Sequence, residues 1–374
     1  MEAIDEHDAV PSAPDTRTEA VIAVDCNGAD LGPEEVAAGA VMAGREGART
    51  ILFGPANELR AACRGAVEGT IEIVDAPVSI AKSADPASAA RANPDASIVQ
   101  AARAVADGRA HALVCAGGTG AALAAGLFNI KRARGVHRPA LALVLPVPGS
   151  PVTLLDVGAN AQARAEHLEQ FAFMGSALAQ TVLGVEHPRV GLLSNGEEAE
   201  RGSPLVVEAH DRLRARVDTG AMEATFELVG NVEGGDLVSG VADVIVTDGL
   251  TGNIALKTME GVSQTMLRAI RDAAMSSTKA KLGGLLLAPA LGGLREEIDP
   301  EGQGGAYLLG LRGLGVVPHG GFGRRGFAQA ILRARRGARE DLIGRTHAAL
   351  AQAGALRRAT PVSARVASLP GNDA

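Results

Sequence analysis

Short runs of apolar residues, many of them β-branched, alternate along the chain with longer segments that have the period of a helix. Continuous apolar runs are typical of strands buried on both faces, and helix-sized segments between them favour a parallel sheet. The pattern therefore predicts an α/β fold of three layers, with a mostly parallel sheet covered by helices on both faces. The predicted strands are AVIAVD, TILFG, IEIV, ALVCAG, ALALVLP, VTLLDVG, RVGLLS, FELVGN and VADVIVTDG.

The two ends of the chain lack this pattern. Residues 1–19 are acidic and polar and have neither the basic start nor the apolar middle of a signal peptide. Residues 357–374 contain two prolines and show weak periodicity. We expect both ends to be disordered tails and residues 20–356 to form a single domain.

Composition narrows the functional classes. Of 374 residues, 47% are apolar and 21% are charged, which is the ordinary globular range. The net charge of −7 gives no global attraction to nucleic acid, so none is expected as a partner. Cys26, Cys63 and Cys115 form no CxxC pair, which is typical of reduced thiols in a cytosolic protein. Familiar metal-ligand spacings such as HExxH are absent from the sequence, and we expect no metal and no cofactor.

The segment LVCAGGTGAALAAGLF, residues 113–128, joins a strand-like run to a helical segment through glycines. It lies within an uncharged stretch, residues 112–130, that has the length of a membrane span, but its glycine and alanine content gives a poor driving force for insertion. A dinucleotide fingerprint would place a third glycine at Leu123, and a Walker loop needs a Gly-Lys pair that the chain lacks. Both nucleotide interpretations are therefore disfavoured.

A phosphate cradle remains, because the pattern occurs twice. VCAGGTG at 114–120 and VTDGLTG at 246–252 each lead from a strand-like run through G-x-T-G into a helical segment. Glycines can expose successive N–H groups, and a helix start carries a positive partial charge that suits an anion. The alternative is a strand-to-helix turn with a good cap.

Two further groups of polar residues could take part in chemistry. Asn253 and Lys257 are four residues apart after the second glycine loop, so a helix would place them on one face, where they could stabilise an oxyanion. Lys257 could equally face solvent. A third loop, LLDVGANAQARAEHL, offers Asn160 and His167, and a lone histidine can be either a catalyst or a structural residue.

Many short motifs occur in an order that resembles the PlsX-type phosphate acyltransferases of bacterial phospholipid synthesis. They are IAVDCNGADLGPEEV, DVGAN followed by EHL, MGS, PRVGLLSNGEE, GNVEG, VTDGLTGNIALKT, GGAYLLG and PHG. The resemblance covers residues 21–335. It implies a cytoplasmic, homodimeric enzyme of Rossmann-like fold that binds membranes peripherally. The implied reaction transfers a fatty acyl group from acyl carrier protein to inorganic phosphate, which is itself the nucleophile.

On this resemblance the candidate site residues receive roles. Lys257 and Asn253 are expected to stabilise the transition state, and His167 to handle a proton. The residues expected to bind phosphate or substrate are Asp25, Gly117, Gly118, Thr119, Gly120, Asn160, Asp248, Gly249, Thr251 and Gly252.

Several positions depart from the family pattern. The departures include Cys26, Asn27, Ala29, Leu31, Gly118, Arg164, Arg201, Ser203 and Phe322. Loss of polar groups at Leu31 and Gly118 removes hydrogen-bond donors from the expected pocket. Two alternatives therefore stay open: a phosphate acyltransferase that uses a small acyl-CoA thioester, and a catalytically degenerate scaffold at the membrane surface.

Two stretches bear on partners. Residues 279–294 are apolar with lysines at the start, and the resemblance places them in a projecting helical hairpin near 270–298. They could lie shallowly in a bilayer, or pack in the core or against a second subunit. The second stretch is the basic cluster KRARGVHR, residues 131–138. It could dock the acidic acyl carrier protein through Lys131, Arg132, Arg134 and Arg138, or it could be a solvated helix end.

Overall fold

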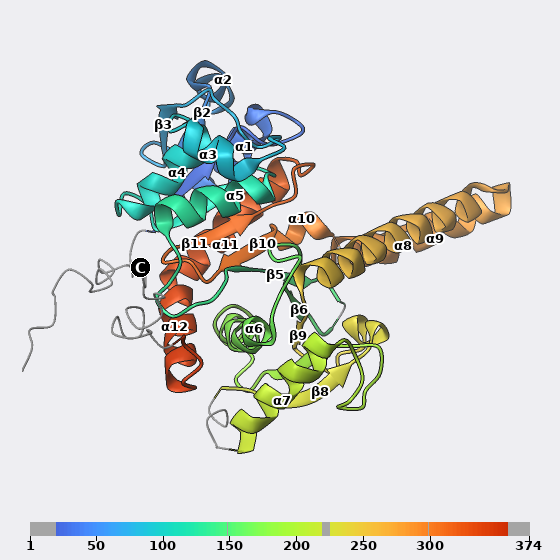
Figure 1. Cartoon of the computed structure of the whole chain (residues 1–374). Helices are drawn as coiled ribbons and strands as arrows, with labels where there is room; N and C mark the ends of the chain where they lie inside the picture. The colour runs from blue at the N-terminus through green and yellow to red at the C-terminus, as the bar shows by residue number, and fades with distance from the viewer. Residues whose placement is uncertain (1–19, 148, 219–224, 298, 358–374) are drawn as a thin grey trace, which may run out of the picture. The chain divides into compact units, whose positions relative to one another are not determined.

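The computed structural model describes residues 20–147, 149–218, 225–297 and 299–357 (Figure 1). These residues form two compact units. Unit 1 contains the described residues up to 130, together with 300–305 and 313–342. Unit 2 contains 131–299, 306–312 and the described residues from 343 onward. The sequence analysis predicts one domain over 20–356, whereas the chain passes between two units several times. The predicted tails, 1–19 and 358–374, lie outside the described residues.

Unit 1 is built on five parallel strands in the order β3-β2-β1-β4-β11. Their bounds are β1 Val21–Asp25, β2 Arg49–Gly54, β3 Ile71–Asp75, β4 Ala112–Cys115 and β11 Leu314–Val317. The central strands β1 and β4 are apolar and almost fully buried, as expected for a sheet covered on both faces. Because all five strands are parallel, the loops that follow them share one edge of the sheet.

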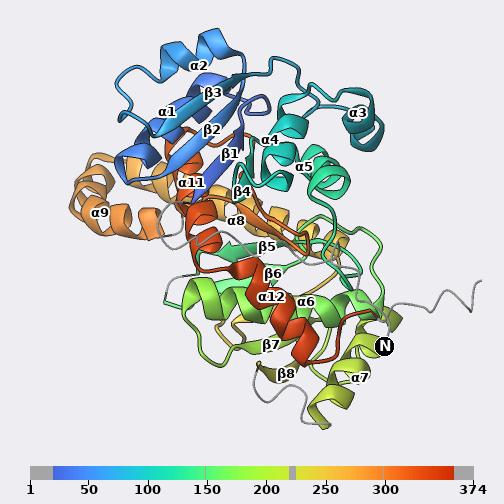
Figure 2. The same cartoon turned by 90° about the vertical axis from the view of Figure 1, so that its left-hand side faces the viewer.

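Helices cover both faces of this sheet (Figure 2). Helices α1, Pro33–Arg45, and α11, Arg324–Arg339, pack on one face, and α4, Ser97–Ala106, and α5, Thr119–Ala125, lie on the other. A side chain at Gly39 would come within 2.7 Å of Phe327 Cβ, so the glycine allows α1 and α11 to approach closely. The shorter helices of unit 1 are α2 Ala56–Ala62, α3 Pro86–Ala92 and α10 Pro300–Gln303, and α5 continues into the π-helical turn Gly126–Ile130.

Unit 2 contains six strands in the order β10-β5-β6-β9-β7-β8. Strand β5 runs antiparallel to β10 and β6, and the remaining pairs are parallel. The strand bounds are β5 Ala140–Leu145, β6 Val152–Leu155, β7 Arg189–Leu193, β8 Glu227–Val232, β9 Val244–Val246 and β10 Ala306–Leu309. Packed against these strands are α6, Ala165–Leu178, and α7, Pro204–Asp218. The π-helical turn Ala179–Leu183 extends α6, a 3₁₀ turn spans Gly234–Val238, and α12 spans Leu342–Gln352.

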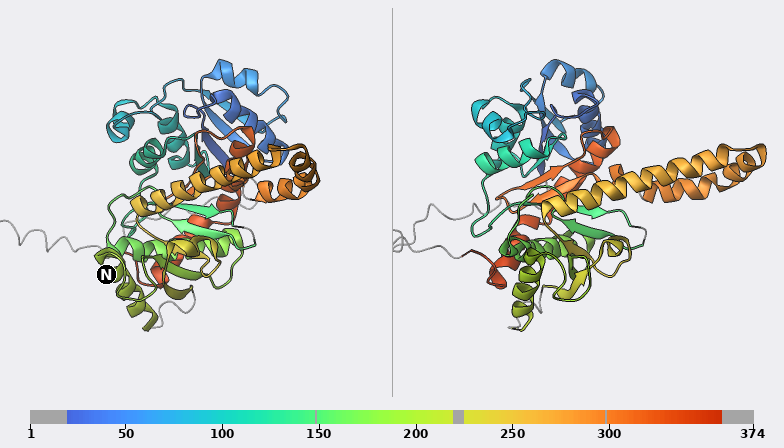
Figure 3. Two further views of the ribbon diagram at one scale, coloured as in Figure 1. Left: turned by 90° about the vertical axis from the view of Figure 1, so that its right-hand side faces the viewer. Right: turned by 45° about the vertical axis from the view of Figure 1, so that its right-hand side comes forward.

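Two long helices of unit 2 form a hairpin, α8, Gly249–Met275, and α9, Thr278–Glu297. They lie side by side in Figure 3 and contact each other. The sequence analysis predicts the hairpin near 270–298, and the structure places the start of α8 at the second glycine loop. Beyond its first turns α8 is largely exposed. Among the described residues, no helix combines the length and apolarity needed to cross a membrane.

All nine predicted strands are present, and the mostly parallel α/β architecture is confirmed. The sequence analysis missed β10 and β11. Glycines flank or interrupt both runs, in GGAYLLG and GLGVV, so neither run shows the continuous β-branched pattern of the other strands.

Candidate active site

Three loops meet at the edge of unit 1 where its strands end, and glycines allow them to pack closely. A side chain at Gly28 would overlap the carbonyl oxygen of Ala116. Gly117 has φ +86°, and a side chain there would lie 2.7 Å from Gly320 Cα. The N–H of Asp30 donates to Gly320 O at 2.8 Å. The loops that follow β1, β4 and β11 are therefore fixed by both space and backbone conformation.

The first glycine loop keeps main-chain donors available. It leads into α5, whose N-cap is Gly118 and which has no side-chain cap. The first N–H groups of a helix have no acceptor within the helix. In the described part of the chain, the structure gives the N–H groups of Thr119 and Gly120 no other acceptor. These donors suit the anion predicted from the sequence.

A cavity of about 630 Å³ lies at the same edge of unit 1. Its polar lining includes Asn27, Ser79, Lys82 and Ser83. A side chain at Gly118 would contact Ala81, which places the glycine loop against the wall of this cavity. Lys82 is exposed and lies 3.6 Å from Asp30 Oδ1. Sequence reasoning missed Lys82, although the rarity of lysine in the chain could have drawn attention to it.

Asp25 lies beneath this edge rather than in the cavity. It is the last residue of β1, is 2% exposed, and accepts hydrogen bonds from Ser97 Oγ at 2.6 Å and from the N–H of Asn27 at 3.2 Å. Burial raises the pKa of Asp25 to about 6, and these hydrogen bonds offset part of the rise. The carboxyl group therefore positions the loop after β1, and its contact with substrate stays a prediction.

In unit 2, the loop after β6 is organised by a buried carboxylate. Asp156 Oδ1 accepts from the N–H groups of Leu141, Gly158 and Ala159 at 3.1, 3.2 and 2.9 Å. Its Oδ2 accepts from the main-chain N–H and the side-chain amide of Asn160, both at 2.8 Å. Burial raises the pKa of Asp156, and these donors offset part of the rise. Asn160 is therefore committed to holding the loop.

The second glycine loop differs from the first, because an acid occupies its main-chain donors. Asp248 is the N-cap of α8, and its Oδ1 accepts from the N–H groups of Leu250 and Thr251, both at 2.9 Å. Thr251 Oγ1 donates to the same carboxylate at 2.7 Å. The N–H of Gly249 donates to Asn160 O at 2.8 Å. The cap interpretation therefore describes this loop better than the open cradle.

The glycines of this second loop serve close packing. A side chain at Gly252 would overlap Asp156 O, and one at Gly249 would lie 2.7 Å from the nitrogen of Asn160. Asn253 Nδ2 donates to Val157 O at 3.1 Å. The structure thus brings the loop after β6 and the start of α8 together.

Lys257 lies one turn beyond Asn253 on α8, with its side chain 50% exposed. Its ammonium forms an ion pair with Glu260 Oε2 at 2.7 Å. The structure therefore gives Lys257 a partner of its own on the helix surface, which the sequence spacing alone did not indicate.

His167 is buried at the start of α6. Its Nδ1 accepts from the N–H of Arg164 at 3.2 Å, which caps the helix. Burial lowers the pKa of His167 to about 4, so the imidazole is neutral at neutral pH. A neutral ring can donate a hydrogen bond through Nε2 but cannot act as a cationic acid. Its position supports a structural role at least as well as the predicted role in proton transfer.

One group of side chains in the described part of the chain could hold a metal ion. It consists of His137, Glu166 and His167, whose possible ligand atoms lie within 4.8 Å of one another. Arg164 Nη1 lies 3.5 Å from Glu166 Oε1, and Arg164 N–H occupies His167 Nδ1. Both contacts compete with a cation.

The predicted basic cluster is a loop of unit 2 whose charged side chains are exposed. Gln170 of α6 fixes this loop, because its Oε1 accepts from the N–H of His137 at 2.7 Å and its Nε2 donates to Gly135 O at 2.9 Å. Four basic side chains are thereby displayed on an anchored backbone. They are Lys131, Arg132, Arg134 and Arg138.

The predicted residues thus fall into two groups. Asp25 and residues 117–120 belong to unit 1, where the loops after β1 and β4 meet. Asn160, residues 248–253, Lys257 and His167 belong to unit 2.

Solved structures with a similar fold include a EutD phosphotransacetylase from Staphylococcus aureus and a phosphotransacetylase from Streptococcus pyogenes. The first has a TM-score of 0.55 at 17% identity, and the alignment covers 85% of this chain and 94% of the other. The second has a TM-score of 0.56 at 17% identity, with 86% and 95% covered. These similarities support the α/β architecture.

Sequence relatives define the family. The family model described as "Fatty acid synthesis protein" matches residues 20–345. A phosphate acyltransferase from Heliobacterium modesticaldum is 42% identical over 326 residues, which cover 86% of this chain and 95% of the relative. One from Desulforudis audaxviator is 43% identical over 324 residues, with 86% and 94% covered. The chain therefore belongs to the fatty acid synthesis protein family that includes the PlsX-type phosphate acyltransferases, and it is an acyltransferase.

Proposed function

We propose that the enzyme transfers a fatty acyl group from acyl carrier protein to inorganic phosphate, forming acyl phosphate for phospholipid synthesis. The observation that carries this proposal is the 42% identity with a phosphate acyltransferase over 326 residues, nearly the whole of that relative. In the reaction, a phosphate oxygen attacks the thioester carbonyl and forms a C–O bond. The C–S bond then breaks, and the carrier thiolate leaves and takes up a proton.

The first glycine loop is the proposed phosphate site. Two observations support this assignment: the N–H groups of Thr119 and Gly120 have no acceptor among the described residues, and the cavity that Lys82 lines is nearby. The second loop is less suited to phosphate, because the Asp248 carboxylate already accepts from its donors. In unit 2, Asn253 and Lys257 are the proposed partners of the negative charge that develops on the thioester oxygen. Lys257 would have to exchange its Glu260 contact for this role.

The exposed basic loop is the proposed docking surface for acyl carrier protein. Lys131, Arg132, Arg134 and Arg138 give it four positive charges, although the whole chain carries −7. Charge complementarity of this kind favours an acidic partner.

The α8–α9 hairpin supports two further proposals. Val262, Met266 and Ile270 are between 47% and 60% exposed and recur every four residues along α8, which suits packing against a second copy of the chain. On α9, Leu282, Leu285 and Leu286 are between 62% and 76% exposed and follow Lys279 and Lys281. We assign this second surface, within residues 279–294, to peripheral contact with the cytoplasmic membrane surface.

A direct assay tests the reaction. Purified enzyme is incubated with palmitoyl carrier protein and phosphate, and acyl phosphate is trapped with hydroxylamine. We expect phosphate-dependent hydroxamate, and a Lys257→Ala variant should form it about 100-fold more slowly because an oxyanion partner is lost. Glu260→Gln, which breaks the same ion pair but keeps the ammonium, should remain active.

The same assay separates the alternatives. A panel with palmitoyl-CoA and acetyl-CoA identifies the thioester that is consumed. Consumption of acetyl-CoA alone would replace the proposed donor with a small acyl-CoA. Absence of phosphate-dependent thioester loss with every donor would leave the scaffold role.

A further inference from the structure

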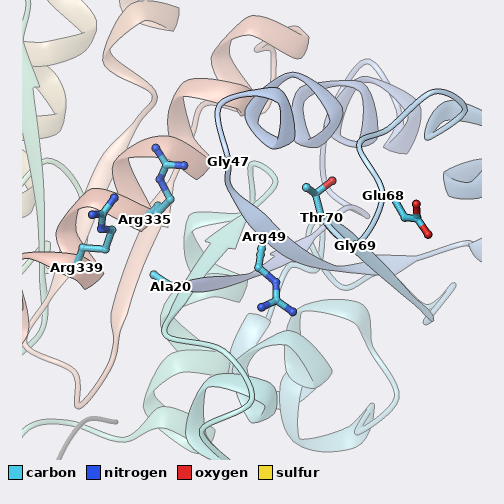
Figure 4. Close-up of a pocket in the computed structure, with 8 residues that line it drawn as sticks. All are labelled: Ala20, Gly47, Arg49, Glu68, Gly69, Thr70, Arg335 and Arg339. Carbon is cyan, nitrogen blue, oxygen red and sulfur yellow. The ribbon is translucent and has the colours of Figure 1, made fainter. Parts of the chain in front are cut away.

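An arginine-lined cavity lies at the edge of unit 1 opposite to the glycine loops. Its volume is about 390 Å³. Ala20 directly precedes β1 and Arg49 begins β2, so the cavity lies where these strands start. Strands of five or six residues separate the two edges of the sheet by roughly 15 Å. The lining residues are Ala20, Gly47, Arg49, Glu68, Gly69, Thr70, Arg335 and Arg339 (Figure 4).

Three arginines and one glutamate are among the lining residues. In Figure 4, Arg335 and Arg339 of α11 lie on one side of the cavity and Thr70 with Glu68 on the other, and the Glu68 carboxylate points away from the two arginines. A guanidinium group offers a planar fork of donors that matches a phosphate group. The lining residues contribute little apolar surface, namely the methyl groups of Ala20 and Thr70. This surface suits a charged ligand rather than an apolar one.

Helix capping explains part of this arrangement. Arg335 Nη1 donates to Glu46 O at 2.6 Å, just beyond the end of α1, and arginines near the end of α11 complement its dipole. Capping does not explain why the space stays open. Gly47 and Gly69 have φ of +80° and +75°, and a side chain at Gly47 would come within 3.6 Å of Arg335 Nη1. Both glycines have a left-handed backbone conformation, in which any other residue would be strained.

We propose that this cavity binds a small phosphorylated compound. Its phosphate group interacts with the guanidinium groups of Arg335 and Arg339. The cavity volume lies within the range of small-ligand sites. Because the cavity is at the opposite edge of the sheet, this site can fill independently of the phosphate site proposed at the first glycine loop.

Calorimetric titration of the full chain tests the proposal. The probes are glucose 6-phosphate, ribose 5-phosphate and AMP, with glucose and inorganic phosphate for comparison. At least one phosphorylated probe should bind saturably, and Arg339→Ala should weaken it at least tenfold. Arg336→Ala is the matched control, because Arg336 is on the same helix and pairs with Glu340 but does not line the cavity. Equal effects of the two variants, or no saturable binding of any phosphorylated probe, would overturn the proposal.

The glutamate gives a second, opposite signature. Glu68→Ala removes a negative charge from a lining residue, so it should leave the phosphorylated probe bound equally well or more tightly. A loss as large as that of Arg339→Ala would contradict the assignment of the phosphate group to the arginines. Circular dichroism checks that each variant folds. Because acyl transfer is not measured, failure here leaves the proposed reaction untouched.

Discussion

The carboxyl group of Asp25 is buried, so its negative charge is unfavourable in the folded state. Its pKa is raised from 3.8 to about 6, so between these values the folded state binds more protons than the unfolded state. Stability from this group therefore falls as pH rises through that window, and the cost, on the order of 3 kcal/mol, persists above it. Asp25→Asn removes the charge and keeps an oxygen that can accept from Ser97. We expect it to be more stable than the parent at pH 8 and to lose this advantage toward pH 4.5.

Urea unfolding at the two pH values measures this difference. Ser97→Ala is the comparison, because it removes a donor that favours the charged carboxylate. It should destabilise the protein more at pH 8 than at pH 4.5. A destabilisation by Asp25→Asn that is the same at both pH values would contradict the assignment.

For His167 we expect a pH dependence of stability that is opposite in sign to that of Asp25. Its pKa falls from 6.5 to about 4 on folding, so the unfolded state binds the extra proton within that window. Stability from this group is present above pH 6.5 and is lost as pH falls toward 4, by on the order of 3 kcal/mol. His167→Gln does not titrate but keeps an acceptor for the N–H of Arg164. We expect its stability, relative to the parent, to improve steadily from pH 7 to pH 4.5.

Unfolding midpoints at pH 4.5, 5.5 and 7 check this expectation. His187→Gln is the control, because His187 is exposed. If both substitutions change the midpoints by the same amount at each pH, His167 is not the buried neutral group described.

At the scale of elements, the hairpin offers two apolar surfaces whose roles can be separated. Leu286→Glu on α9 puts a charge where the side chain is 76% exposed, and Met266→Glu does the same on α8 at 60% exposure. The proposed assignments predict that Leu286→Glu abolishes flotation with anionic vesicles and leaves the solution mass unchanged. Met266→Glu should lower the mass measured by light scattering to that of a monomer. Flotation of Leu286→Glu at the level of the parent would exclude the bilayer contact.

The strands could be predicted from sequence because their apolar runs are continuous, as in AVIAVD of β1. The two glycine loops look alike in sequence, yet only the first keeps open amides. The difference lies in the N-cap residue: Gly118 of α5 has no side chain that could accept a hydrogen bond, whereas the Asp248 carboxylate caps α8. The Lys257–Glu260 pair and the cavity wall around Lys82 depend on tertiary placement, which spacing alone does not determine.

At the scale of the whole molecule, the division into two units was not visible in the sequence. Unit 1 takes three segments of the chain, 20–130, 300–305 and 313–342, from the described residues. A domain boundary can be recognised in a sequence when a single linker joins two continuous domains. This chain passes between the units repeatedly and at short intervals. The same folding back brings β11 beside β4, about 200 residues earlier in sequence.

The positive charge of the loop at 131–138 contrasts with the negative net charge of the whole chain, and the last prediction tests this contrast. The chain carries −7 overall, which repels an acidic partner at long range, and the docking proposal assigns the local attraction to the loop at 131–138. Reversing Arg134 and Arg138 to Glu should raise the KM for acyl carrier protein at least tenfold at low salt and leave kcat unchanged, because docking rather than chemistry is altered. The defect should shrink at 0.5 M salt, where the screening length is below about 5 Å. The double variant Arg60→Glu/Arg64→Glu, which reverses two exposed charges in unit 1, is the control for net charge. Equal KM increases for the two double variants would place the docking surface elsewhere.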